Sequence, residues 1–197
     1  DEQYFYVSGV LNYKNPDNIR AVGKKRDYAT PSCDWLGVTL DTYNDRQNAV
    51  SFWTNPNGLR TDAAVKNDDV DPISDINFSW NTFWDVKTAL NKQGWSTELR
   101  IPFSSLRFQL QDDKSLMGIS IVRYCAAISE WSTFPAISPN FQWAFWKPSL
   151  LAVIEFTGLT QKKPVYITPY ISSGMGQVNE LNESGRAYKM KTTPKFA

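Results

Sequence analysis

Short runs of aromatic and β-branched residues recur along the chain and are separated by clusters of Asn, Asp, Gly and Pro. The runs cover residues 4–13, 35–43, 48–55, 83–90, 96–101, 117–128 and 150–156. In the fifth run, "STELRI", Leu99 and Ile101 alternate with Glu98 and Arg100, a period typical of a strand with one buried face. No segment carries a convincing apolar repeat of helical period over more than about two turns. The pattern predicts an all-β chain.

Two of these runs are joined by a short segment rich in turn-forming residues. The segment "DTYNDRQN", residues 41–48, lies between the runs 35–43 and 48–55, and this arrangement predicts a β-hairpin. Val38 and its alternate neighbours share one face of the first strand, and Phe52 lies on the matching face of the second. We expect these faces to form half of a sandwich core.

Two long connections separate the later strands. Residues 66–81 form a polar segment that contains several Asp, and residues 129–149 contain much of the aromatic surplus of a chain with 8 Trp. Loops of this length are uncommon and are often functional. Beyond Leu159 the chain becomes basic and its composition changes. We therefore expect one domain at 1–159, followed at 160–197 by a linker and the start of a further β-rich region.

Composition removes several classes of function. The formal net charge is +1, so no overall field attracts nucleic acid, and nucleic acid is not an expected partner. The chain contains no His, which removes the usual general base and the commonest transition-metal ligand. Cys33 and Cys125 lack the spacing of a zinc site and are either two buried thiols or one disulfide. The longest charge-free stretch, residues 131–146, contains prolines and polar residues and is not a membrane-spanning helix.

Several motifs follow one another in an informative order. They are "DWLGVTLDTYNDRQNAVSFWTNPNGLRTDA" (34–63), "WNTFWDVKT" (80–88), "GWSTELRIPFSSLRF" (94–108), "MGISIVRY" (117–124) and "FTGL" (156–159). The most specific of these motifs are two that occur together, "N-P-x-G-x-x-x-D" and a later "W-[ST]-x-E-x-x-I-P-[FW]-x-x-L". Over residues 2–172 the chain resembles a carbohydrate-binding family 9-like domain. More particularly, it resembles the version at the N-terminus of a bacterial envelope family of unknown function, in which a predicted outer-membrane β-barrel region follows.

The resemblance implies an antiparallel β-sandwich of jelly-roll-like type. The family carries one or two strands ahead of the segment that begins at Asp1, so we expect N-terminal strands to be missing from this sequence. The region from Val165 resembles the start of the barrel, which implies membrane association through a C-terminal β-barrel. The implied location is the cell envelope of a Gram-negative bacterium, in the periplasm or associated with the outer membrane.

The resemblance also suggests a reason for the proline in "RIPFSSLRF". In such sandwiches the strand ends at Pro102, which cannot donate a ladder hydrogen bond and so protects a sheet edge. The apolar residues of the following turn, Phe103, Leu106 and Phe108, are then expected to pack into the core.

Aromatic side chains are the main candidates for ligand binding. Family 9 modules hold a sugar end between two Trp rings, and polar side chains around the rings bind its hydroxyl groups. Trp80 and Trp84 fall on the recurrent family pattern and are expected to be structural. Trp53 faces opposite Phe52, which places it on the outer or concave surface. The candidate ligand-binding residues are Trp53, Trp131, Trp143, Trp146, Arg60 and Asp62. Packing of the rings and a surface ion pair of the last two residues are the alternatives.

Carboxylate side chains could form two further kinds of site, a metal site or a catalytic site. Asp68, Asp69 and Asp71 supply hard oxygen ligands in one loop, and they form a possible structural calcium site that matches no EF-hand pattern. A solvated acidic loop is the alternative, and no other cofactor is expected. No local motif pairs two carboxylates as glycoside hydrolysis requires, so we do not expect an enzyme.

The sequence therefore favours a non-catalytic carbohydrate-binding module of a cell-envelope protein, with a glycan as its ligand. The alternative is a structural or protein-interaction module attached to the outer-membrane barrel, without a sugar site, in which residues 129–149 contact envelope protein partners. Two rings that face one another across a groove would favour a sugar, and a flat aromatic patch would favour assembly.

Overall fold

A computed structural model describes residues 3–23, 25–27, 30–71, 73–138, 140–141, 143–159, 167, 169–178 and 189–196. Throughout these residues the regular elements are β-strands and single turns of 3-10 helix. The strands are β1 (Tyr4–Asn12), β2 (Trp35–Asp41), β3 (Ala49–Thr54), β4 (Arg60–Val65), β5 (Ile76–Asn77), β6 (Asp85–Asn91), β7 (Gly94–Pro102), β8 (Lys114–Cys125), β9 (Glu130–Phe134), β10 (Ala152–Thr157), β11 (Ile171–Val178) and β12 (Lys189–Phe196). The 3-10 turns are η1 (Pro16–Asn18), η2 (Asn67–Asp69), η3 (Phe103–Ser105), η4 (Ala144–Trp146) and η5 (Pro148–Leu150).

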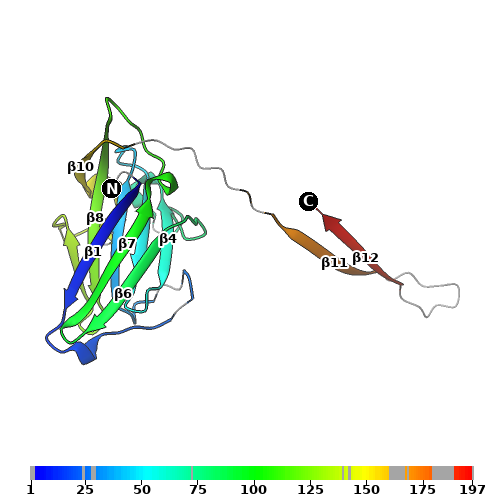
Figure 1. Ribbon diagram of the computed structural model, residues 1–197, viewed down its shortest axis with the longest axis horizontal. Helices are drawn as coiled ribbons and strands as arrows, with labels where there is room; N and C mark the ends of the chain where they lie inside the picture. Colours follow the sequence, from blue (N-terminus) through cyan, green and yellow to red (C-terminus); the bar gives the residue numbers. More distant parts are fainter. Residues whose placement is uncertain are drawn as a thin grey trace. The chain divides into compact units, whose positions relative to one another are not determined.

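The strands form three antiparallel sheets. One sheet has three strands in the order β1-β7-β6. A second has seven strands: six follow the order β10-β8-β2-β3-β4-β5, and the seventh, β9, pairs with residues 121–125 of β8, after the part of β8 that pairs with β10. The first two sheets face one another as the layers of a sandwich (Figure 1). The hairpin expected at residues 35–55 is confirmed, because β2 pairs with β3 in a register that places Val38 opposite Phe52. The predicted class, an antiparallel β-sandwich, is confirmed.

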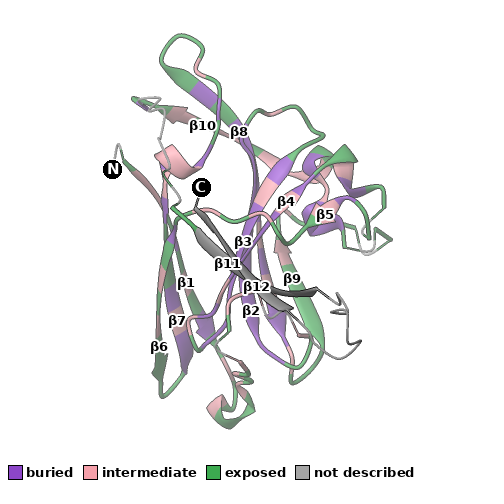
Figure 2. Cartoon of the chain, turned by 90° about the vertical axis from the view of Figure 1, so that its right-hand side faces the viewer, coloured by how far each residue is buried: buried purple, intermediate pink, exposed green. Residues whose placement is uncertain are grey.

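The space between the two sheets is filled by alternate residues of the facing strands. Trp95, Leu99 and Ile101 of β7 pack with Val38 and Phe52 of the larger sheet, and all five are fully buried. Buried stripes on both sheets therefore face each other (Figure 2). Because side chains alternate along a strand, these stripes leave the opposite faces free for other contacts.

The outer face of the larger sheet is also partly buried. All seven residues of β2 are buried, so this strand is covered on both faces. Small side chains on its outer face and on that of its neighbours, such as Gly37, Ser51 and Ser120, lie under a second cluster of aromatic residues. The sequence pattern, which shows a single apolar face, did not predict this second layer.

The proline at the end of β7 has a different role from the one expected. The strand is central, between β1 and β6, so Pro102 does not protect a sheet edge. It lies opposite Tyr4 at the end of the ladder, where the next N–H, of Phe103, bonds to the carbonyl of Gln3 at 2.9 Å. The three apolar residues of the following turn, Phe103, Leu106 and Phe108, are buried in the core as predicted.

The two cysteines are free thiols, and the register explains why they do not pair. The pairing of β2 with β8 begins at Trp35, which lies opposite Tyr124, so Cys33 lies outside the paired residues. The sulfur of Cys33 accepts hydrogen bonds from the N–H of Val22 and the side-chain amide of Asn55, whereas Cys125 lies opposite Glu130 of β9.

The chain divides into two compact units, Asp1–Lys163 and Pro164–Ala197. The first contains the sandwich, and the second contains the two-stranded sheet of β11 and β12. In the described residues, no helix has the length and apolar character needed to cross a membrane.

Candidate functional site

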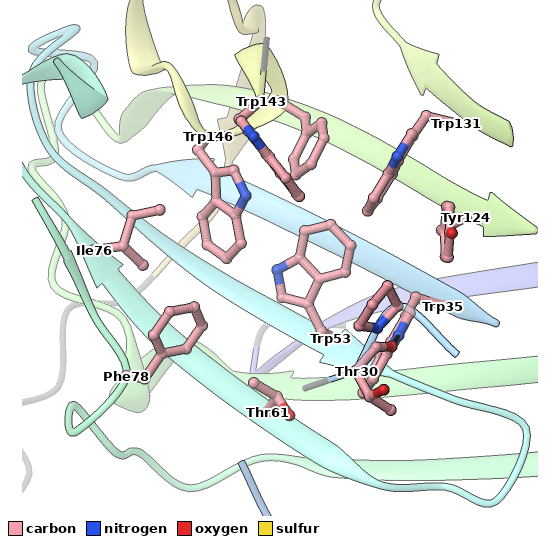
Figure 3. Close-up of a pocket in the computed structure, with 12 residues that line it drawn as sticks. Thr30, Trp35, Trp53, Thr61, Ile76, Phe78, Tyr124, Trp131, Trp143 and Trp146 are labelled. Atoms are coloured by element: carbon pink, nitrogen blue, oxygen red, sulfur yellow. Dashed lines mark hydrogen bonds between the residues drawn. The ribbon is translucent and has the colours of Figure 1, made fainter. Parts of the chain in front are cut away.

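A pocket of about 370 Å³ lies on the outer face of the seven-stranded sheet. Trp53 is at the centre of its lining, Trp146 and Trp143 descend on one side, and Thr61 lies below (Figure 3). The surface exposed inside the pocket is almost entirely apolar. The lining residues are Thr30, Pro31, Trp35, Trp53, Thr61, Ile76, Phe78, Tyr124, Trp131, Trp143, Phe145 and Trp146.

Trp53 lies flat on the sheet because its cross-strand neighbour is Gly37. A Cβ atom on Gly37 would lie only 2.4 Å from the Trp53 ring, so the missing side chain provides the space for the indole. The indole Nε1 donates to Ser51 Oγ at 2.7 Å. The predicted strand face of Trp53 is correct, but its side chain is only 6% exposed because residues 145 and 146 cover it.

The cover comes from residues 143–150, here called the aromatic segment. Its first residue, Trp143, has a left-handed backbone (φ 59°), which turns the chain into η4. Phe145 is anchored to the sheet through its carbonyl, which accepts a hydrogen bond from Ser120 Oγ at 3.0 Å. Trp146 stacks on Trp53, with ring centroids 5.2 Å apart and an interplanar angle of 25°.

Trp131 lies on a strand that the sequence did not predict. It belongs to β9 and lies opposite Tyr124 of β8, with ring centroids 4.3 Å apart. Its ring also stacks on that of Phe145, with centroids 4.8 Å apart, and meets Trp53 and Trp143 edge-on. The expected loop at 129–149 therefore begins with five residues of strand, which fix Trp131 against the sheet.

The stacked pair of Trp53 and Trp146 is too close to hold a sugar between its rings. A pyranose between parallel rings needs two carbon–carbon contact distances, about 7–8 Å in all. The two buried indoles are instead the floor of the pocket. Ring surface for a ligand comes from Trp131, Trp143 and Phe78, which are 39%, 45% and 44% exposed.

One buried polar atom in the pocket has no partner. The hydroxyl of Thr61 makes no hydrogen bond to any described residue, although its oxygen is buried. A buried hydroxyl without a partner costs free energy that a ligand hydroxyl can recover. No charged side chain is found among the described residues of the lining. The sequence pattern did not indicate Thr61, because β4 was not predicted.

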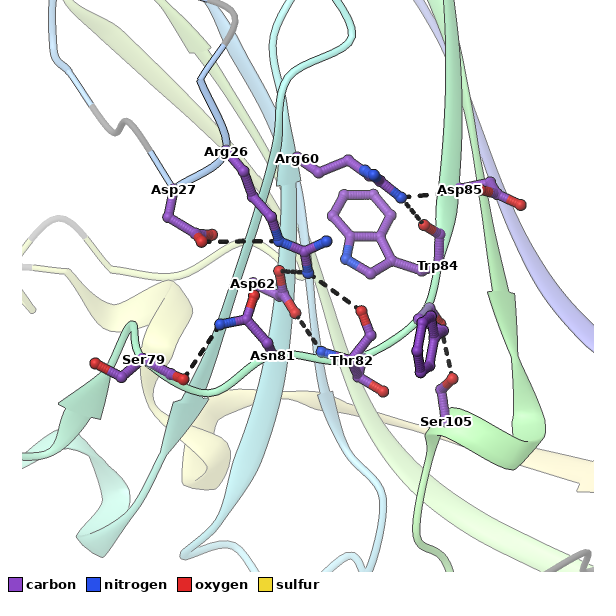
Figure 4. Close-up of polar contacts among 11 residues, drawn as sticks. Arg26, Asp27, Arg60, Asp62, Ser79, Asn81, Thr82, Trp84, Asp85 and Ser105 are labelled. Atoms are coloured by element: carbon purple, nitrogen blue, oxygen red, sulfur yellow. Dashed lines mark hydrogen bonds and ion pairs between the residues drawn. The ribbon is translucent and has the colours of Figure 1, made fainter. Parts of the chain in front are cut away.

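Arg60 and Asp62 lie on the same strand as Thr61 but on its other face, outside the pocket lining. Asp62 is fully buried and accepts hydrogen bonds from Arg26 Nη2 at 2.5 Å and from the backbone N–H of Thr82 at 2.7 Å (Figure 4). Arg60 donates to the carbonyl of Trp84 at 2.6 Å. These bonds hold the chain before β6 against β4. The alternative considered from the sequence, an ion pair between Arg60 and Asp62, is not formed, because Asp62 pairs with Arg26 and Arg60 with Asp85.

The two other tryptophans of the family pattern occupy structural positions, as expected. Trp84 is 2% exposed and packs edge-on against Phe52 in the core. Its neighbour Phe83 points the other way and is 68% exposed. Trp80 is partly buried against the same cluster.

The acidic residues considered for calcium lie in residues 66–75, here called the acidic loop. Within the described part of the chain, no three acidic, Cys or His side chains are placed to hold a metal. Asp71 accepts hydrogen bonds from its own loop, at Ile73 N and Ser74 Oγ. Asp69 is buried without a hydrogen-bond partner for either carboxylate oxygen. Burial raises the pKa of Asp69 to about 6, against the attraction of nearby Lys147.

Comparison with known proteins finds similarity in structure but no match in sequence. No protein-family model matches the chain, and no curated protein sequence matches it. A family 9 carbohydrate-binding module from Caldicellulosiruptor kristjanssonii, solved in complex with cellotriose, matches with a TM-score of 0.50 and 20% identity over 86% of this chain and 77% of that one. A family 9 module from the same organism, solved in complex with glucose, matches with a TM-score of 0.50 and 19% identity, over 82% of this chain and 75% of that one. The fold is that of a family 9-like carbohydrate-binding module.

This family 9-like fold agrees with the resemblance drawn from the sequence motifs. The two structures do not address the envelope family or its β-barrel region, which stay predictions. In the family 9-like sandwich, all four predicted Trp residues, at positions 53, 131, 143 and 146, come together in one pocket. Arg60 and Asp62 lie elsewhere.

Proposed function

We propose that this chain is a non-catalytic carbohydrate-binding module whose aromatic pocket binds a neutral saccharide. The observation that carries the proposal is the hollow of about 370 Å³ with half-exposed rings and a buried, unpartnered hydroxyl at Thr61. Carbohydrate sites combine these two elements, because a pyranose has an apolar C–H face and a ring of hydroxyl groups. The two structures of family 9 modules, in complex with cellotriose and with glucose, support a saccharide ligand.

The rings and the hydroxyl have separate tasks in this proposal. Trp131 and Trp143 cover the apolar face of the sugar, and the indoles of Trp53 and Trp146 close the floor beneath it. Thr61 exchanges a hydrogen bond with a sugar hydroxyl and fixes its orientation. Because no charged side chain is found in the described lining, a charged sugar would lose its hydration without a compensating ion pair. The pocket therefore prefers neutral sugars.

Binding is expected to be weak, because few polar anchors offset the cost of immobilising the sugar. The concave shape of the pocket favours a saccharide over a flat protein partner. The resemblance of the sequence motifs to the envelope family supports a location in the Gram-negative cell envelope, where the module would be joined to a β-barrel region. Contacts with envelope proteins belong to the same proposal.

Titration with cellotriose and glucose tests the binding proposal. We expect saturable binding by calorimetry and by tryptophan fluorescence, with a negative heat-capacity change. Trp131→Ala and Trp143→Ala should each weaken binding about tenfold, which corresponds to ~1.4 kcal/mol. Phe83→Ala is the matched control, since this exposed ring lies outside the pocket lining. Absence of binding to both sugars and to a broad set of immobilised neutral glycans would overturn the proposal.

A further inference from the structure

The aromatic segment and the acidic loop are fastened together by one lysine. Lys147 follows Trp146 in the chain, and its Nζ donates to the backbone carbonyl oxygens of Asp68 at 2.8 Å and of Asp69 at 2.9 Å. Both bonds are charge-assisted, which makes them stronger than bonds between neutral groups. The side chain is only partly exposed, so water competes weakly for the same donors.

The acidic loop adopts an unusual backbone to present these carbonyls. Asn67, Asp68 and Asp69 all have left-handed conformations, with φ of 53°, 54° and 50°. Such conformations are uncommon for residues other than Gly, and they persist where surrounding contacts determine them. Here the convergence of two carbonyl oxygens on a single ammonium group supplies that contact.

Side chains of the loop add to the fastening. The carboxylate of Asp68 accepts hydrogen bonds from the N–H of Ser149 at 2.8 Å and from its Oγ at 2.7 Å. The buried carboxyl of Asp69 has no hydrogen-bond partner, and the positive charge of Lys147 attracts it. The loop therefore meets the aromatic segment at two successive points, Lys147 and Ser149.

Both joined segments lead directly into the pocket. The acidic loop connects β4 to β5, which carries Ile76 and is followed by Phe78, and both side chains line the pocket. Trp146, next to Lys147, packs edge-on against Phe78 with centroids 6.0 Å apart. The fastening at Lys147 thus fixes the distance between Trp146 in the floor of the pocket and Phe78 in its wall.

We propose that Lys147 is a positioning residue for the aromatic pocket. Its ammonium group gathers backbone carbonyls as a bound cation does in oxygen-lined loops, and it holds Trp146 and Phe78 at the separation that leaves the pocket open. Lys147 acts through these rings and is not itself in the lining. The inference rests on the proposed function, because it takes the pocket to be the saccharide site.

The test compares Lys147→Met with Lys147→Arg in the full chain. Met keeps the length of the side chain and removes the charge, whereas Arg keeps the charge. We expect Lys147→Met to weaken cellotriose binding about tenfold, and Lys147→Arg to restore at least half of the loss on a logarithmic scale. Lys114→Met is the matched control, because it removes a surface ion pair with Glu155 outside the lining and should leave binding unchanged.

A second readout separates positioning from general stability. The stacked indoles of Trp53 and Trp146 should give a coupled near-ultraviolet circular dichroism signal, and Lys147→Met should reduce it at a temperature where the variant is fully folded. If Lys147→Met does not fold, Ser149→Ala serves instead. It removes one of the two bonds to Asp68, and about a threefold loss of affinity is expected.

The outcomes distinguish the two proposals. If the folded Lys147→Met variant has lower thermal stability but wild-type affinity and an unchanged indole signal, Lys147 is a structural anchor only and the inference is overturned. If the wild-type chain binds no saccharide, the proposed function fails. In that case the indole signal of the variants still decides whether Lys147 positions the rings.

Discussion

Gly37 illustrates how a missing side chain can define a site. The residue lies in the middle of β2, directly across from Trp53, and the indole occupies the space where a Cβ would be. The ring then has a flat support and an acceptor, Ser51 Oγ, for its N–H group. The position of the pocket floor thus depends on the smallest residue in the strand.

Substitution of Gly37 should affect both stability and binding. Gly37→Ala places a methyl group 2.4 Å from the Trp53 ring, so the indole must move. We expect a loss of about 1–3 kcal/mol in the free energy of unfolding, measured in urea, because an overpacked site must shift its neighbours. The affinity of Gly37→Ala for cellotriose should also fall. Gly9→Ala is the control, since there the new atom meets the flexible end of Leu36. Wild-type affinity in Gly37→Ala would contradict this account.

Asp69 should make stability depend on pH in the direction opposite to most carboxylates. Its pKa is about 6 in the folded chain and near 3.8 when unfolded, so between these values the folded state binds more protons. The contribution of Asp69 to stability therefore falls as pH rises from about 4 to 6, and is constant above. A shift of this size corresponds to about 2–3 kcal/mol. Urea unfolding across pH 4 to 7 should show this fall in the wild-type chain and a much smaller one in Asp69→Asn.

Asp45 provides a control, because its pKa is shifted in the opposite direction to that of Asp69. Despite some desolvation, hydrogen bonds from the side chain and backbone of Asn48 and from the backbone of Gln47 lower the pKa of Asp45. Its contribution to stability is therefore lost as pH falls, and Asp45→Asn should reduce acid sensitivity. Parallel pH curves for wild type and Asp69→Asn would refute the account of Asp69.

At the scale of elements, β4 separates two functions on its two faces. Thr61 faces the pocket, whereas Asp62 faces the other side and holds Arg26 and the backbone of Thr82. The strand thus contributes to the site on one face and anchors the chain that leads into β6 on the other. Substitutions on its two faces should therefore have different consequences.

Asp62→Ala should destabilise the fold and leave the pocket intact. The change removes a buried acceptor from Arg26 and from an N–H group, for which we expect a loss of about 2–4 kcal/mol in urea unfolding. Below the unfolding transition, cellotriose affinity should equal that of wild type. Asp85→Ala is the control, because its surface pairs with Arg100 and Arg60 contribute less than about 1 kcal/mol. Weak binding with normal stability in Asp62→Ala would instead place this residue in the ligand site.

The elements also show where sequence reasoning succeeds and where it fails. Alternation placed Trp53 opposite Phe52 correctly, because a strand has a fixed side-chain period. Alternation could not predict how deeply Trp53 is buried, because the residues that cover it lie about ninety positions later in the chain. The strand "RTDAAV" was missed because Asp and Ala are depleted in strands, and Thr61 was missed with it.

At the scale of the whole molecule, the seven-stranded sheet has two covered faces with different partners. The inner face packs on the three-stranded sheet, and this arrangement follows from alternating patterns that can be read in the sequence. The outer face packs on the aromatic segment, whose sequence shows no simple period, and Trp131 of β9 stacks on Phe145 of this segment. The sandwich was therefore predictable, whereas the pocket geometry depends on tertiary contacts.

The sandwich should fold and bind without the C-terminal unit. The residues of both hydrophobic clusters and of the pocket all lie within the unit Asp1–Lys163. A fragment of residues 1–163 should therefore unfold within about 2 °C of the full chain in calorimetry, since a shift of 1 kcal/mol corresponds to about 2–4 °C at this size. Its cellotriose affinity should be unchanged. A large loss of either property would show that the second unit supports the first.

The separation of the inner and outer faces of the large sheet has a practical consequence for engineering. Randomising the pocket positions 78, 131 and 143 changes rings that stand on the far side of the sheet from the main core. A display library built on these positions should keep a high proportion of folded clones, so selection could retune ligand preference while the scaffold stays constant.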